Sequence, residues 1–264
     1  MFGLWDILFI SIITIQAVIV SYVFHPKWKA LMITLPIPFP FIYLAVGHPI
    51  NATNIIGFLL LFIFTQGVRI FYKHLRIPII LAIVLSATIY CLLGMLVLNI
   101  LMFNEMTFWV SVFSIFIGGI ILRWVLPIRE EQGGRTQLPL LIKLPITIAL
   151  VIFLVLIKGQ LGGFATLFPM VGVFAAFEAR RSLWTMGRQI PVVMIIQVPM
   201  MVVIYLCEPS MGSGWALLLG GLTFLVGLVI MQYSLFFGKA SQPISQAVER
   251  GLTKASQPIS QSVE

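Results

Sequence analysis

The stretch IPIILAIVLSATIYCLLGMLVLNILM, residues 77–102, contains no charged side chain. Coiled as an α-helix, which rises 1.5 Å per residue, a run of this length extends about 39 Å. This exceeds the hydrocarbon core of a bilayer, which is roughly 30 Å thick. We therefore interpret residues 77–102 as a membrane-spanning helix, and similar apolar runs lie on both sides of it in the chain.

The composition of the whole chain agrees with this interpretation. Hydrophobic residues make up 60% of the 264 residues and charged residues only 9%, and the mean hydropathy is +1.10. A soluble domain is about 25% charged and could not hide this much apolar surface from water. The composition excludes a water-soluble enzyme, a nucleic-acid-binding protein and a disordered chain. It predicts an all-α, polytopic helical membrane protein.

Apolar runs between polar breaks predict nine membrane-spanning helices. The run LPIPFP at 35–40 places three prolines in the second span, and Phe168-Pro169 interrupts the seventh, so neither is expected to be a regular α-helix. Only Lys158-Gly159-Gln160 separates the sixth span from the seventh, so these two form either a tight hairpin or one re-entrant unit. The nine spans are expected at about 4–24, 30–47, 53–72, 77–102, 106–127, 141–158, 161–178, 190–207 and 214–237.

The basic residues predict the orientation of these spans. Fifteen of the sixteen Lys and Arg residues fall in one set of alternating loops, and only Lys158 falls in the other. Because loops rich in Lys and Arg stay in the cytoplasm, the N-terminus is expected outside and the C-terminus in the cytoplasm. We expect the protein in a bacterial-type cytoplasmic (inner) membrane.

A long internal repeat is suggested by matching motifs. Arg76-Ile77-Pro78 at the fourth span resembles Gln189-Ile190-Pro191 at the eighth, and Ile117-Gly118-Gly119-Ile120 in the fifth resembles Leu219-Gly220-Gly221-Leu222 in the ninth. The alternative is that apolar helices resemble one another by composition alone. The repeat predicts two parallel four-helix units after an extra first helix. The expected segments are an N-terminal helix and loop (1–29), the first unit (30–127), a cytoplasmic loop (128–140), the second unit (141–237) and a flexible tail (238–264).

The second unit resembles the small four-helix GlpM-type membrane proteins. The resemblance rests on Leu140-Leu141-Ile142-Lys143 at its start, on the Phe168-Pro169 step, and on Glu178 with Arg180, Arg181 and Ser182 at the end of its second helix. In the parallel alignment the first unit is a diverged copy without the Phe-Pro step, and Thr65 stands near the position of Glu178. The family is named for a link to glycerol 3-phosphate metabolism, so the resemblance implies a fold more than an activity.

Charged residues are expected near the ends of the spans and not in the middle of the membrane, which weakens a proton-coupled mechanism. A small anionic substrate or a lipid head group is expected to bind a cluster on the cytoplasmic side, because arginine pairs well with phosphate. The alternative is an anchor that only contacts acidic lipids. The cluster comprises Arg69, Lys73 and Arg76 together with Glu178, Arg180 and Arg181. The sequence contains no catalytic motif and no metal-ligand cluster, so we expect no enzyme, metal or cofactor.

Small and amide residues within the spans are expected to serve packing. Gly118, Gly119, Gly220 and Gly221 allow close approach of helices and are candidates for the contact between the two units. Gln197 is expected to form a hydrogen bond between helices, with substrate contact as the less favoured alternative.

The tail repeats ASQPISQ at 240–246 and 255–261. This composition is typical of a flexible segment, which either docks a partner or has no role. The function expected first is a transporter or flippase-like protein for a small anionic or lipidic substrate. The alternative is a non-catalytic membrane subunit or anchor that holds a partner through the tail. Membrane lipids are expected partners, and nucleic acid is not.

Overall fold

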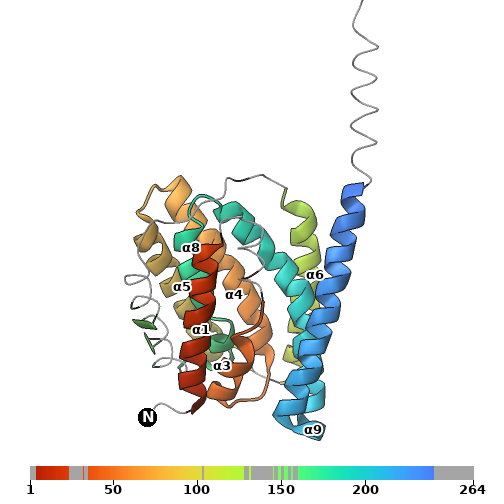
Figure 1. The fold of residues 1–264 in the computed structure, drawn as a ribbon. Helices are drawn as coiled ribbons and strands as arrows, with labels where there is room; N and C mark the ends of the chain where they lie inside the picture. Colours follow the sequence, from red (N-terminus) through yellow and green to blue (C-terminus); the bar gives the residue numbers. More distant parts are fainter. Residues whose placement is uncertain are drawn as a thin grey trace, which may run out of the picture.

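A computed structural model describes residues 4–23, 35–102, 104–127 and 160–240, with positions 32, 131, 145, 148–149, 152–153 and 156 in addition. The predicted span at 141–158 and the tail beyond 240 therefore lie outside the described residues, apart from single positions. Within these residues the fold is all-α, as predicted, with seven α-helices, one 3-10 turn and one π-helical turn (Figure 1). In chain order they are α1 (Leu4–Tyr22), α3 (Phe39–Val46), α4 (Ala52–Arg69), η1 (Ile70–His74), α5 (Ile79–Ile100), α6 (Glu105–Val125), η2 (Gly162–Leu167), α8 (Met170–Glu178) and α9 (Leu183–Ala240).

Helix α9 is much longer than the others because it contains a reversal of the chain. At Gly212 the backbone has φ 77° and ψ 163°, a non-helical conformation that glycine adopts without steric cost. Its two arms, 183–211 and 213–240, pack against each other, with Gly220 facing Ile204. The predicted spans at 190–207 and 214–237 therefore correspond to these arms, and a glycine reversal takes the place of the expected loop.

Four helices are long and apolar enough to cross a membrane: Ala52–His74, Ile79–Ile100, Glu105–Val125 and Leu183–Met231. Large apolar side chains cover their outer surfaces, such as Leu92 on α5, Phe113 on α6 and Leu222 on α9, each more than half exposed. In water so much exposed apolar surface would be a liability. A bilayer is the solvent that suits it, so the fold is that of a helical membrane protein. The described residues contain four candidate spans, so the total of nine stays a prediction.

Contacts between helix ends define two ends of the bundle. At the end that we call the basic end, Lys73 lies next to Glu131, and the Trp184 indole donates to the Pro127 carbonyl at 3.1 Å. At the opposite end, the Tyr43 hydroxyl is hydrogen-bonded to Glu208. Consequently α4 runs toward the basic end and the first arm of α9 runs away from it, as Figure 1 shows.

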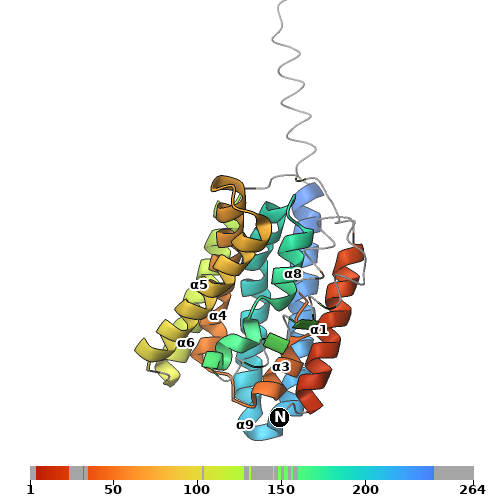
Figure 2. The same cartoon turned by 90° about the vertical axis from the view of Figure 1, so that its left-hand side faces the viewer.

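Helix α4 is the central element, since it packs against α5, α6, α9 and η2. Its side chains Ile55, Phe58, Phe64 and Val68 are completely or almost completely buried. In Figure 2, α1 lies at one edge of the bundle, α5 and α6 lie toward the other, and the short elements lie between them. The short elements are thus enclosed by longer helices, in the interior of the bundle.

Candidate functional site

Two chain segments in the interior of the bundle are broken by proline. The first leads through Pro36 and Pro38 to α3, which begins at Phe39 and has only eight residues. The second is the 3-10 turn η2, followed by Phe168-Pro169 and then by α8, which has nine residues. Proline lacks a backbone N–H and clashes with the preceding turn, so a regular helix cannot continue through it. The predicted interruptions at 35–40 and at Phe168-Pro169 are confirmed.

Broken backbone inside a membrane requires substitute hydrogen-bond partners, because lipid offers none. Asn54 of α4 supplies one: its Nδ2 donates to the Thr166 hydroxyl at 3.0 Å, and that hydroxyl donates to the Gly163 carbonyl at 2.7 Å. Tyr90 of α5 supplies another, with its hydroxyl donating to the Phe164 carbonyl at 2.9 Å. All of these side chains are buried. The turn η2 is therefore held in place by α4 and α5.

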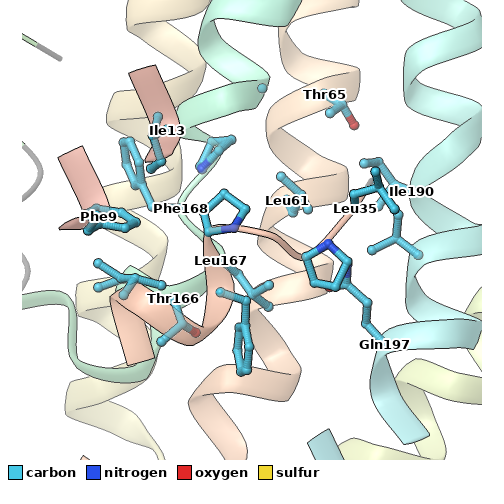
Figure 3. Close-up of a pocket in the computed structure, with 18 of the residues that line it drawn as sticks. Phe9, Ile13, Leu35, Leu61, Thr65, Thr166, Leu167, Phe168, Ile190 and Gln197 are labelled. Atoms are coloured by element: carbon cyan, nitrogen blue, oxygen red, sulfur yellow. The ribbon is translucent and has the colours of Figure 1, made fainter. Parts of the chain in front are cut away.

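A cavity of about 100 Å³ lies where the two broken segments meet. Phe9 and Ile13 of α1 face it from one side, and Ile190 and Gln197 of α9 face it from the other (Figure 3). The remaining lining residues come from the first broken segment and α3, from α4, from the second broken segment and α8, and from α9; they are Leu35, Pro36, Pro38, Phe39, Ile42, Leu61, Thr65, Ala165, Thr166, Leu167, Phe168, Pro169, Gly172, Met186 and Val193.

The cavity lies near the middle of the helices that surround it. Leu61 and Thr65 belong to the second half of α4, and Gln197 is midway along the first arm of α9. The polar side chains in its lining, Thr65, Thr166 and Gln197, are uncharged and each more than nine-tenths buried. The first turns of α3 and α8 also line it, through Ile42 and Gly172. The cavity thus combines an apolar lining with a few hydrogen-bonding groups, as small-molecule sites commonly do.

The predicted basic cluster is distributed over the basic end of the bundle. The Arg69 guanidinium lies over the Trp184 ring at 4.1 Å from its centroid and donates to the Gln66 side chain at 3.0 Å. Lys73 forms an ion pair with Glu131 at 2.7 Å. Two of the predicted cations are therefore already in contact with groups of the protein itself.

The other members of the cluster lie in two separate turns. Arg76 is exposed in the turn before α5, where its φ of 55° is positive. Glu178 ends α8 and is buried, Arg180 lies over the Phe177 ring at 5.7 Å, and Arg181 is exposed. None of the six cluster residues lines the cavity.

Glu131 is a residue of this end that the sequence analysis did not select. Its carboxylate accepts from the backbone N–H of Thr185 at 2.7 Å, in the first turn of α9, as well as from Lys73. An acidic side chain at a helix N-terminus satisfies free N–H groups and complements the helix dipole. The available signal was the pair Glu130-Glu131, which stands between Arg129 and Arg135 in a loop at the basic end.

In each of the two glycine pairs, one glycine is packed against another helix and the other is not. A Cβ atom on Gly119 would lie 2.9 Å from Met194, and one on Gly220 would lie 2.5 Å from Ile204, so both glycines lie against the first arm of α9. At Gly118 and Gly221 a Cβ atom would meet nothing within 4 Å. The first arm of α9 is thus approached closely by α6 on one side and by the second arm on another.

These features together define the class of protein: a helical membrane protein with a small cavity between two interrupted segments. No family model, no curated protein and no solved structure matches the chain. The resemblance of 140–237 to the GlpM-type proteins stays a prediction.

Proposed function

We propose that this chain is a membrane transport protein, transporter- or flippase-like, that moves a small anionic or lipidic substrate by way of the interior cavity. The observation that carries the proposal is the meeting of two proline-broken segments around a cavity near the middle of the long helices. Broken helices at membrane depth are characteristic of transporter binding sites, where backbone and helix ends meet the substrate. A protein that serves only as an anchor has no need of such a site.

Two features of the cavity bear on the substrate. Its volume of about 100 Å³ is well below the roughly 300–1,000 Å³ of sites for drug-sized ligands, so a small solute fits better than an entire lipid. Helix α8 begins at the cavity, and the N-terminal end of a helix favours negative charge. Of the two expected substrate classes, the small anion is therefore the better supported.

The proposal includes nine spans, with the basic end in the cytoplasm and the N-terminus outside. The directions of α4, α5, α6 and the two arms of α9 support this arrangement, because each crossing reverses the previous one along the chain where the structure describes it. Arg76 and Arg181, both exposed, are positioned to contact acidic lipid head groups at that face.

The experiment is a transport assay on the purified full chain in liposomes. Inorganic phosphate and acetate serve as anionic probes, glycerol as an uncharged probe, and a fluorescent phosphatidylglycerol as the lipid probe. We expect movement of an anion, blocked by Val193→Phe, which fills the cavity because Val193 lines it and is 5% exposed. The matched control is Val110→Phe, at a position that is 55% exposed on α6.

Movement that is equal in both variants would contradict a path through the cavity. If no probe moves, the anchoring subunit is the better hypothesis. Truncation after Phe237 then tests whether the tail holds a partner.

A further inference from the structure

The described helices contain the same order of elements twice. In the first series a Phe-Pro step at 39–40 begins the short helix α3, which is followed by the long helices α4 and α5. In the second series a Phe-Pro step at 168–169 precedes the short helix α8, which is followed by the two arms of α9. Both Phe-Pro steps contribute to the lining of the cavity, through Phe39, Phe168 and Pro169.

Corresponding elements of the two series run in opposite directions. Helix α3 leads from the cavity toward Tyr43 at the opposite end, and α8 leads from the cavity toward the turn before Trp184 at the basic end. Helix α4 runs toward the basic end, whereas the first arm of α9 runs away from it (Figure 1). The same reversal relates α5 to the second arm of α9. In the chain, helix α6 lies between the two series. It adds one crossing of the bundle, and this crossing inverts the second series relative to the first.

Helix packing distinguishes this pairing from the parallel pairing expected from the glycine motifs. The parallel pairing would make α5 and α6 the counterpart of the two arms of α9. The arms of α9 pack closely, with Gly227 against Ile196, whereas α5 and α6 barely touch where the structure describes them. Helices α4 and α5 do pack closely, with Gly67 against Ser86. The α4–α5 hairpin is therefore the better counterpart of α9.

The polar residues of the cavity follow the same pairing. Thr65 is the fourteenth residue of α4, and Gln197 is the fifteenth residue of α9. Both line the cavity, from helices that pack against each other in opposite directions. A pseudo-two-fold axis in the plane of the membrane, passing between α4 and the first arm of α9, would exchange them.

We propose that the chain consists of two inverted halves and that the cavity opens alternately toward the two ends of the bundle, with α3 closing one end and α8 the other. This inference rests on the proposed function, because it describes how that same site would exchange its substrate. In proteins with inverted halves, each half can adopt the conformation of the other, which turns the site from one side to the other. The sequence expectation of a span at 141–158 supplies the partner of α1, although it lies outside the described residues.

At each end, a side-chain contact among the described residues joins a helix of the first series to α9. At the opposite end the Tyr43 hydroxyl binds Glu208, which joins α3 to α9. At the basic end the Arg69 guanidinium lies on the Trp184 ring, which joins α4 to α9 near the end of α8. Loss of either contact should favour the state that is open at that end and close the other.

The test measures access to a cysteine in the cavity from both sides. Thr65→Cys serves as the reporter in full-length protein with Cys91→Ala and Cys207→Ala, and Thr88→Cys on the exposed face of α5 is the matched control. A charged, membrane-impermeant methanethiosulfonate is applied to right-side-out and to inverted vesicles. Tyr43→Phe should raise the labelling rate from the Glu208 side and lower it from the basic side, and Arg69→Gln should do the reverse. We expect the ratio of the two rates to change about fivefold in each direction, as loss of one such contact implies.

The inference is overturned if both substitutions raise labelling from the same side, or if Thr65→Cys reacts no faster than Thr88→Cys in every background. Trp184→Leu, as a second variant at the basic end, must shift labelling in the same direction as Arg69→Gln. If the two substitutions shift labelling in opposite directions but no probe moves in liposomes, the inverted halves are upheld and the transport proposal is contradicted. If a probe moves but the two substitutions do not shift labelling in opposite directions, the transport proposal is upheld and the inverted halves are contradicted.

Discussion

Replacing Gly163 with alanine tests whether η2 must lie directly against α4. A Cβ atom at this position would be 2.0 Å from the Thr53 hydroxyl oxygen and 2.8 Å from Oδ1 of Asn54. Real Cβ atoms do not approach other atoms so closely, so either η2 or the start of α4 must move. Movement would also stretch the bond from Asn54 to the carbonyl of Gly163, now 3.3 Å.

The expected loss of stability can be assembled from these contacts. Overpacking of a core costs about 1–3 kcal/mol, and weakening of one buried hydrogen bond costs about 1 kcal/mol. Gly163→Ala should therefore lower the free energy of unfolding by about 2–4 kcal/mol. At about 2–4 °C per kcal/mol for a chain of this size, the midpoint of thermal unfolding in detergent should fall by roughly 5–15 °C.

Two further variants make the measurement specific. Gly118→Ala is the control, because a Cβ atom there meets nothing within 4 Å and alanine favours the helix. Thr53→Ala removes the atom closest to the new methyl group, so Gly163→Ala and Thr53→Ala together should destabilise less than the sum of the two single changes. Equal stability of Gly163→Ala and Gly118→Ala, or strict additivity of the pair, would refute the described packing.

Tyr90→Phe should lower the unfolding free energy by about 1–3 kcal/mol, because a buried carbonyl of η2 loses its donor; equilibrium unfolding in mixed micelles would detect this. Glu131→Gln should cost about 0.5–2 kcal/mol through its weaker bond to the N–H of Thr185, and an unchanged unfolding curve would argue against the cap. Gly220→Leu should prevent correct assembly of α9, whereas Gly221→Leu should be tolerated, because Gly220 faces the other arm and Gly221 does not; size-exclusion profiles distinguish the two.

Hydropathy alone located the three long helices in the middle of the chain. The expected spans 53–72, 77–102 and 106–127 lie within a few residues of α4, α5 and α6. The interruptions could also be predicted, because proline acts locally and needs no knowledge of neighbours.

The partners of each helix could not be predicted in the same way. A membrane helix that is apolar on every side carries no stripe to mark its packed face. Glycine motifs therefore suggested a pairing of α6 with the second arm of α9, although the two members of each glycine pair differ in their surroundings. The two Phe-Pro steps at 39–40 and 168–169 are visible in the sequence. That they line one cavity could not be predicted, because this depends on which helices face each other.

Helix α6 also bears on how the chain inserts during synthesis. Lys73 precedes α6 in the chain and Arg188 follows it, yet both lie at the same end of the bundle, because Glu131 joins Lys73 to the start of α9 and Arg188 donates to the Leu126 carbonyl. A chain without α6 would carry these two residues on opposite faces of the membrane, and the preference of basic loops for the cytoplasm could then be satisfied for one half only. If the chain consists of two inverted halves, as we propose, this single helix allows both halves to obey one insertion rule while they face in opposite directions.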